Sequence, residues 1–445
     1  MLNAIWVLMI VGAVVCGALS GKLDLVVKAS TESANGAVEL AIGLVGVMAF
    51  WIGMMKVLQE AGLLRAIARA LKPIMTRLFP DIPPEHPAMS MMIMNITSNL
   101  LGLGNAATPF GLKAMMELNK LNQTKGVATN SMCLFLAINT SGLSILPTGM
   151  IAIRSSLGSV EAGSIVITTM MATAISTTVA IITAKTMERL PRFAMPTEGL
   201  SVDTTEAERD IGALDTGDAE ASIEAEAQTL EGWQRWAVWG LIGTVAGSFL
   251  YAMSLEASTV VEGVAQGWLG AVQTVIKDWV LILLLVSIVL YGALRGVKVY
   301  DALVEGGKEG FQVALKIIPY LVAILVAVGM LRASGAIDLI VVALQPVTAL
   351  VGMPAEALPM ALLRTLSGSG AYGVSAEIMQ THGPDSLVGQ IVSTMQGSTE
   401  TTFYVLALYF GVAQVRNGRH ALVACLCADM AGALGAVWAC RLLLG

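Results

Sequence analysis

Met395-Gln-Gly-Ser-Thr-Glu-Thr-Thr-Phe-Tyr-Val405 is a polar stretch that interrupts a run of otherwise apolar sequence and carries an ionisable residue, Glu400. If the surrounding run crosses a membrane, the interruption needs an explanation, because unwound backbone persists in hydrocarbon only where it faces protein or a wet cavity. An ionisable side chain there costs roughly 2.5–3.5 kcal/mol on insertion scales. The stretch therefore predicts a broken membrane helix at a functional site.

The composition indicates a membrane protein. Of 445 residues, 56% are hydrophobic and 13% are charged, whereas soluble domains carry roughly 45–50% apolar and about 25% charged residues. Crossing a bilayer takes about 20 apolar residues, and we predict transmembrane helices at 4–20, 37–59, 160–187, 233–254, 278–296, 311–332 and 421–440. The first run is interpreted as a mature span rather than a secretory signal, because no positive residue precedes Ile5.

The chain contains two related halves. The motifs Gly53-Met54, Gly62 and Ala70-Leu-Lys-Pro73 recur as Gly329-Met330, Gly335 and Ala343-Leu-Gln-Pro346. Downstream, Asn95-Ile-Thr-Ser-Asn99 corresponds to Arg364-Thr-Leu-Ser-Gly368, and Ile138-Asn-Thr-Ser-Gly142 corresponds to Met395-Gln-Gly-Ser-Thr399. Each half is predicted to hold two spans, an amphipathic stretch, an interrupted hairpin, an interrupted helix and a closing span.

The positive residues of the two halves lie at opposite ends of matched segments. The amphipathic stretch 62–79 contains four Lys or Arg residues and its counterpart 334–351 contains none. Because cytoplasmic loops carry the excess of Lys and Arg, we predict an all-α polytopic protein of two inverted repeats, each with an interfacial helix, a re-entrant hairpin and a broken helix. The crossing count is about nine, with a cytoplasmic amino end. The predicted interruptions lie at 95–109, 139–148, 364–373 and 396–402.

Four segments follow from this organisation. They are a first repeat at 1–192, an acidic flexible linker at 193–232, a connecting transmembrane helix with an external loop at 233–276, and a second repeat at 277–445. The linker is acidic and poor in aromatic residues, so it cannot bury enough apolar area to fold. The chain has no phosphate-binding loop, dinucleotide fingerprint, basic nucleic-acid patch or metal-ligand spacing, which argues against an ATP-driven pump, a cofactor or a bound metal.

Two motifs carry a family resemblance. The segment Asn95-Ile-Thr-Ser-Asn-Leu-Leu-Gly-Leu-Gly-Asn-Ala-Ala-Thr-Pro-Phe-Gly-Leu-Lys-Ala-Met115 resembles spore maturation protein A, and Gly383-Pro-Asp-Ser386 with Met395–Val405 resembles spore maturation protein B. The chain is thus similar to a fusion of two members of the nucleoside-recognition, or gate-domain, family. That family resembles concentrative nucleoside transporters, which implies inverted repeats with an interfacial helix, a re-entrant hairpin and an unwound helix. The resemblance supplies no substrate.

The candidate site residues are the polar groups of the four interruptions. Solute contact is predicted for Asn95, Ser98, Asn99, Asn105, Thr108, Asn139, Thr140, Ser141, Arg364, Ser367, Ser369, Gln396, Ser398, Thr399, Glu400 and Thr401. The uncharged members could instead form interhelical hydrogen bonds. Arg364 could clamp an anionic solute or simply neutralise Glu400. We predict that the two charges lie close together and face one polar cavity, because neither can remain in an apolar segment without a partner, a solute or water. Asp429 in the closing span could relay an ion, as Glu400 could, or pack against a neighbouring hydroxyl.

The leading functional hypothesis is an inner-membrane secondary transporter or channel for a small polar or anionic organic solute. Inverted repeats with broken helices bind their solutes where the interruptions meet. The expected partners are the solute, a coupling Na+ or H+, the lipid bilayer and a second copy of the chain, with no nucleic acid. The alternative hypothesis is a non-transporting membrane scaffold that supports envelope or spore maturation. No nucleophile–base pair or paired-carboxylate motif predicts an enzyme.

Overall fold

The computed structural model describes residues 2–102, 104–196, 232–258, 260–261, 264–265 and 280–444. The predicted acidic linker lies almost entirely outside these residues. The described chain is helical apart from a two-residue antiparallel pairing of β1 (Val260–Val261) with β2 (Val264–Ala265).

Among its described residues, the first half of the chain forms eight α-helices and a 3-10 turn at Pro191–Phe193. The helices are α1 (Leu2–Leu19), α2 (Leu23–Glu60), α3 (Leu63–Leu78), α4 (Pro87–Leu100), α5 (Gly104–Leu121), α6 (Asn130–Thr140), α7 (Thr148–Ser156) and α8 (Ile165–Met187).

In the described residues, α11 follows the first half, and the helices after α11 repeat the order of elements of the first half. The helices are α11 (Gly232–Ser258), α13 (Val280–Leu294), α14 (Val299–Ser334), α15 (Ala336–Leu350), α16 (Leu358–Leu366), α17 (Gly368–His382), α18 (Leu387–Ser398), α19 (Thr402–Val412) and α20 (Ala421–Leu443), with a 3-10 turn at Ala355–Ala357.

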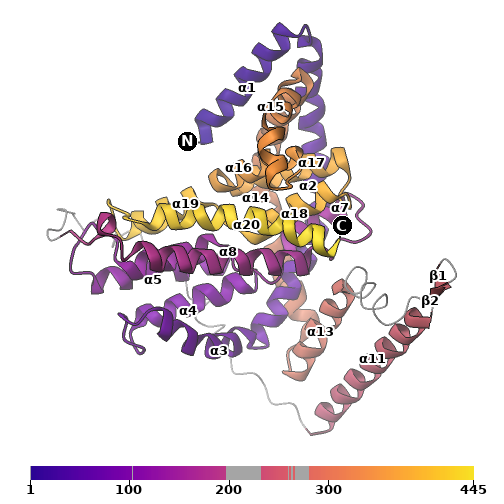
Figure 1. Cartoon of the computed structure of the whole chain (residues 1–445). Coiled ribbons are helices and arrows are strands. Elements are labelled where there is room, and N and C mark those ends of the chain that lie inside the picture. Colours follow the sequence, from indigo (N-terminus) through magenta and orange to yellow (C-terminus); the bar gives the residue numbers. More distant parts are fainter. Residues whose placement is uncertain are drawn as a thin grey trace.

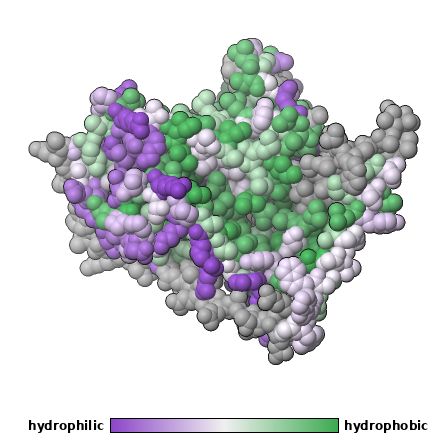
Figure 2. Space-filling model, turned by 60° about the horizontal axis from the view of Figure 1, so that its bottom comes forward, coloured by the Kyte–Doolittle hydropathy of each residue, from purple (hydrophilic) through white to green (hydrophobic). Residues whose placement is uncertain are grey.

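The protein is a multi-pass membrane protein. Four helices in the described residues are long and apolar enough to cross a bilayer, namely Leu23–Glu60, Ile165–Met187, Trp236–Ser258 and Ala421–Leu443. Shorter apolar helices occur at Trp6–Leu19, Ile282–Leu294 and Val322–Ser334. Figure 2 shows a broad hydrophobic surface across the centre of the molecule, with hydrophilic residues gathered at one side. Such a continuous apolar surface is not stable against water.

Two of the helices are longer than their apolar runs predict. The run 37–59 belongs to α2, which begins at Leu23, and the run 311–332 belongs to α14, which begins at Val299. The apolar pattern identifies only the part of a helix in hydrocarbon, whereas the charged residues in the first turns of both helices continue the helical backbone toward water. The two helices therefore begin about three to four turns before the predicted transmembrane runs.

A left-handed glycine separates the long helix from the amphipathic helix in both halves. Gly62 (φ 75°) lies between α2 and α3, and Gly335 (φ 82°) lies between α14 and α15. A side chain would strain this conformation. Each amphipathic helix then contains a proline, Pro73 or Pro346, at the same distance from its glycine.

Two antiparallel helix pairs form the frame of the molecule. In Figure 1, α8 and α20 lie side by side through the middle, and α2 packs against α14. Glycines allow the close approach of the second pair, because a Cβ added at Gly53 would lie 2.5 Å from the Leu303 carbonyl oxygen, and one at Gly310 would lie 2.6 Å from Ala49 Cα. These pairs hold the two hairpins, α4–α5 and α16–α17, against the broken helices α6–α7 and α18–α19.

Candidate functional site

The two broken helices cross at their interruptions. The chain is non-helical between Thr140 and Thr148 and again between Ser398 and Thr402, within both predicted ranges. The backbone N–H of Glu400 donates to the Thr140 carbonyl oxygen at 2.8 Å. Gly142 has a φ of 59°, and a Cβ there would lie 2.6 Å from the Thr399 backbone. Each interruption thus supplies a backbone partner that the other lacks.

The crossing helices run in opposite directions. At one end, before α6, the Ala128 N–H donates to the Asn417 carbonyl oxygen at 2.9 Å, just after α19. At the other end, Arg154 near the end of α7 pairs with Asp385 just before α18, with Nη2 and Oδ1 2.8 Å apart. The matched segments α6–α7 and α18–α19 are therefore antiparallel.

A cavity of about 240 Å³ lies at the crossing point. It is bounded by the tips of both hairpins, through Asn99 and Gly102 from the first and Arg364 and Gly368 from the second. The remaining lining residues are Gly142, Leu143, Ser144, Leu146, Pro147, Thr148, Gly149, Met150, Tyr372, Gln396, Gly397 and Glu400. All four interruptions thus meet at one polar cavity, which we call the central cavity.

Arg364 and Glu400 lie together at this cavity, as the sequence predicted, with Nη2 and Oε2 3.6 Å apart. Only 8% of the arginine side chain is exposed, against 50% of the glutamate side chain. The guanidinium also donates to the Thr399 carbonyl oxygen and, at 3.4 Å, to the Thr401 hydroxyl. Arg364 is therefore largely enclosed, and Glu400 is the charged group that reaches the open space.

Gln396 is the second polar group of the cavity wall. Its side chain is 3% exposed and lies within reach of the Tyr372 hydroxyl, which lines the same cavity; the amide has no other side-chain hydrogen-bond partner in the part of the chain that the structure describes. One hydroxyl satisfies only part of the hydrogen-bonding capacity of an amide, and leaving a buried polar group unsatisfied costs roughly 1–3 kcal/mol. A group of this kind that lines a cavity marks a place where a polar solute or water binds.

Tyr372 and Arg154 were missed by the sequence analysis. Tyr372 lines the central cavity and approaches Gly149, where an added Cβ would lie 2.8 Å from the tyrosine oxygen. Arg154 is completely buried and joins the halves through Asp385 and the Pro384 carbonyl oxygen. Arg154 directly follows an apolar run, and a charged residue at such a place in a membrane protein is a signal of function. Nothing in the sequence distinguished Tyr372.

Several predicted site residues form an interhelical network instead of lining the cavity. Asn95 Nδ2 donates to the Ala107 carbonyl oxygen at 2.7 Å and to the Tyr409 hydroxyl at 3.2 Å. That hydroxyl donates to Asn139 Oδ1 at 3.4 Å, and Asn99 Nδ2 donates to the same oxygen at 3.1 Å. Only Asn99 of these amides also lines the cavity. The network links the first hairpin to both broken helices.

The other predicted residues serve local roles or lie away from the cavity lining. The hydroxyls of Thr140, Ser141, Ser398 and Thr399 donate to carbonyl oxygens within their own helical turns. Ser367 caps α17 by accepting from the Gly370 N–H. Ser98, Thr108 and Ser369 are not among the lining residues, and the side chain of Asn105 lies outside the described part.

Asp429 lies behind the second interruption. It is 6% exposed, and its Oδ2 accepts a hydrogen bond from the Thr402 hydroxyl at 2.7 Å. Its other oxygen is buried without a partner among the described residues. The hydroxyl contact agrees with the packing alternative, and the unpaired oxygen leaves a proton site open. Within the described ranges, no three His, Cys, Asp or Glu residues gather in a group that could hold a metal.

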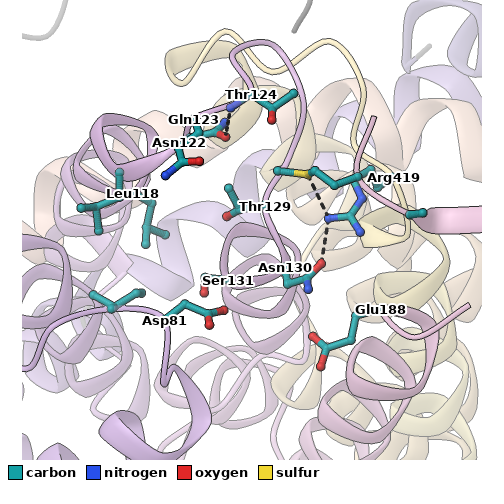
Figure 3. Close-up of a pocket in the computed structure, with 14 residues that line it drawn as sticks. Asp81, Leu118, Asn122, Gln123, Thr124, Thr129, Asn130, Ser131, Glu188 and Arg419 are labelled. Atoms are coloured by element: carbon teal, nitrogen blue, oxygen red, sulfur yellow. Dashed lines mark hydrogen bonds between the residues drawn. The ribbon is translucent and has the colours of Figure 1, made fainter. Parts of the chain in front are cut away.

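A second polar cavity of about 440 Å³ lies at the end where α6 begins (Figure 3). Asp81, Asn130 and Glu188 face this space from three different segments. Arg419 is held at its edge by the Asn130 side chain, at 2.7 Å, and by the Phe193 carbonyl oxygen. Arg419 has a φ of 48°, a conformation uncommon for a non-glycine residue. The segments at this end of the molecule are therefore held together by specific side-chain contacts.

Comparison with known proteins identifies the family of the chain. The model of the "Nucleoside recognition" (Gate) family matches residues 41–189 and 314–416, more than half of the chain. Spore maturation protein B of Bacillus subtilis (strain 168) is 44% identical over 163 residues, which is 37% of this chain and 92% of that protein. Spore maturation protein A of the same organism is 43% identical over 182 residues, 41% of this chain and 93% of that protein.

No solved structure is detectably similar to the chain. The family match covers both interruptions of the first half and both of the second, and each relative is matched over nearly its whole length. The chain therefore belongs to the nucleoside-recognition (Gate) family, as a fusion of regions similar to spore maturation proteins A and B.

Proposed function

We propose that the protein is a secondary transporter that moves a small polar solute across the cytoplasmic membrane through the central cavity. The observation that carries this proposal is the buried, incompletely paired amide of Gln396 in a cavity wall shared by four interrupted segments. Broken helices are stable in a membrane only where they face protein or a wet cavity, and transporters of this architecture bind their solutes there.

The charges favour a neutral solute over an anion. Arg364 is enclosed by the Thr399 carbonyl and by Glu400, whereas the Glu400 carboxylate is half exposed to the cavity. An anion entering the cavity would meet the carboxylate first. Hydroxyl and amino groups, by contrast, can donate to Glu400 and pair with the Gln396 amide. A volume of about 240 Å³ is below the roughly 300–1,000 Å³ of drug-sized sites, so the solute is small. A nucleoside-like compound fits the family's description.

The antiparallel broken helices support an inverted repeat. Exchanging the halves maps the contact between Ala128 and Asn417 onto the contact between Arg154 and Asp385, because each joins the start of one broken helix to the end of the other. Lys120, Lys125 and Arg416 lie at the first of these ends, which the positive-inside rule places in the cytoplasm. With α11 as the connector between repeats, the chain crosses the membrane nine times.

In this proposal the end contacts act as two gates. Opening the Ala128–Asn417 contact connects the central cavity with the cytoplasm, and opening the Arg154–Asp385 contact connects it with the outside. Alternating access requires that only one of them is open at a time. The second candidate function, a scaffold in envelope or spore maturation, is favoured by the names of the two relatives, and it requires neither gate to open.

Solute uptake into liposomes that contain the purified full chain tests the proposal. A panel of nucleosides, neutral amino acids and dicarboxylates is offered, with the Gln396→Leu variant beside the wild type. Gln345→Leu, an exposed position on α15, is the matched control. We expect saturable uptake of a neutral solute that Gln396→Leu removes and Gln345→Leu retains. Equal uptake by both variants, or none by the wild type for any solute, contradicts the transport function.

A further inference from the structure

A third cavity, of about 510 Å³, lies apart from the central cavity and shares none of its lining residues. Its walls come from α1, α14, α15, α16 and α17, through apolar side chains. They are Met9, Val328, Leu331, Ile337, Leu358, Pro359, Leu362, Leu363, Leu366, Val374 and Ile378. Leu362 is 59% exposed, so the wall continues onto the outer surface of the helices. In a membrane that surface faces acyl chains.

Four polar side chains also line this apolar cavity: Arg332, Glu377, Glu356 and His382. Arg332 Nε lies 2.5 Å from Glu377 Oε1, and its Nη1 donates to the Thr381 hydroxyl at 2.7 Å. Glu377 is 9% exposed, whereas one third of the Arg332 side chain is exposed. Arg332 lies in the last turn of α14, beside the left-handed Gly335, where a helix leaves hydrocarbon for the interface.

We propose that this cavity binds one membrane glycerophospholipid whose headgroup carries an ammonium group. One acyl chain occupies the apolar walls, which offer water too few polar partners. The phosphate lies beside the exposed part of the Arg332 guanidinium, since arginine recognises phosphate through its planar set of donors. The ammonium lies beside Glu356. Because two carboxylates, Glu356 and Glu377, line the cavity with a single guanidinium, a headgroup that carries only negative charge is disfavoured.

The cavity lies where α1, α14, α15 and the second hairpin meet. Met9 belongs to α1, Ile337 to α15, and Val374 to the second hairpin, other residues of which line the central cavity. Membrane helices are held together largely by close packing, since no hydrophobic driving force acts between them in lipid. A bound acyl chain would supply that packing by filling the space between these elements. The lipid is therefore a structural component of the second half rather than a transported solute.

Native mass spectrometry of the full chain, extracted in mild detergent, tests this proposal. Ile337→Trp fills the cavity from α15, and Leu362→Trp fills it independently from α16. Leu339→Trp, on α15 but 65% exposed and outside the lining, is the matched control. We expect one phosphatidylethanolamine per wild-type and Leu339→Trp chain, and loss of that bound mass from both filling variants. Equal retention in all four proteins identifies ordinary surrounding lipid and overturns the site.

The headgroup assignment is tested by exchange. Delipidated wild-type protein is offered equimolar phosphatidylethanolamine and phosphatidylglycerol with identical acyl chains, and Glu356→Gln is compared with it. We expect the wild type to retain mainly phosphatidylethanolamine and the variant to lose that preference. No preference in the wild type, retention of phosphatidylglycerol instead, or capture of a single-chain amphiphile alone overturns the proposed occupant. None of these outcomes depends on solute transport.

Discussion

The backbone N–H of Glu400 donates to the carbonyl oxygen of Thr140, 2.8 Å away, and so joins the broken helices of the two halves at their interruptions. Neither group has a helical partner, because Glu400 and Thr140 lie at the ends of helical segments. An unpaired backbone group in hydrocarbon costs several kcal/mol. This bond fixes the backbone position from which the half-exposed Glu400 carboxylate projects. Because it joins two main-chain groups, its formation does not depend on the side chains at these positions.

Gly142→Ala is expected to weaken this crossing. The alanine Cβ would lie 2.6 Å from the Thr399 backbone, and the φ of 59° is unfavourable for a residue with a side chain. Strain of that kind costs about 1–3 kcal/mol before the clash is counted. Gly46→Ala is the control, because a Cβ there meets nothing within 4 Å. Thermal unfolding in detergent should show a lower midpoint for Gly142→Ala only; equal midpoints would mean that the crossing can shift without cost.

Glu400→Gln is expected to abolish solute flux with a small effect on folding. The glutamine is nearly isosteric and removes only the charge that faces the central cavity. Removing one partner of a fully buried ion pair costs roughly 3–5 kcal/mol, but half of the Glu400 side chain is exposed and Arg364 keeps its carbonyl acceptor. The loss of stability should therefore be well below that range. Flux and thermal unfolding are measured on the same preparation, and an active, folded variant would exclude both a binding and a pairing role.

The interruptions, the repeated order of elements and the Arg364–Glu400 pair could be predicted from sequence, because each rests on local composition. Gly, Ser and Thr clusters within apolar runs predicted the breaks, and two charges in one half predicted a pair. The Asn95–Tyr409–Asn139 network could not be predicted, since Asn95 and Tyr409 are 314 residues apart and meet only when the halves pack. Asn99 and Asn139, for which solute contact was predicted, hydrogen-bond to each other, and Tyr372 lines the cavity where α7 and α17 approach closely.

Asp385→Asn is expected to destabilise the protein by about 3 kcal/mol, the order found when a buried pair loses one partner. Arg154 is completely buried, and Asp385 also accepts from the Ser159 hydroxyl and from the Val160 N–H at 2.9 Å. The control is Glu85→Gln, whose pairing with Lys72 is largely exposed and worth about 1 kcal/mol or less. Chemical unfolding distinguishes the two. A similar small loss for both would show that the carbonyl contacts alone hold this end closed.

Lowering the pH is expected to destabilise the end that contains Arg419, through His420. His420 precedes the membrane span of α20 and is completely buried, with neither ring nitrogen partnered in the described part of the chain. Burial, with Arg419 and Lys185 nearby, lowers the pKa of His420 to about 4 from its usual 6.5.

Between these two pKa values the unfolded chain binds the proton and the folded chain does not. The free energy of unfolding therefore falls as the pH falls through this window, and it levels off below it. At about 1.4 kcal/mol for each pKa unit, the shift from 6.5 to about 4 corresponds to a total loss of at most about 3–4 kcal/mol. His420→Phe keeps the ring that contacts Phe193 edge-on and removes the titration, so its stability should vary less than that of the wild type between pH 7 and pH 4, as measured by thermal unfolding. Parallel pH profiles for the two proteins would show that His420 is protonated as readily in the folded chain as in the unfolded one.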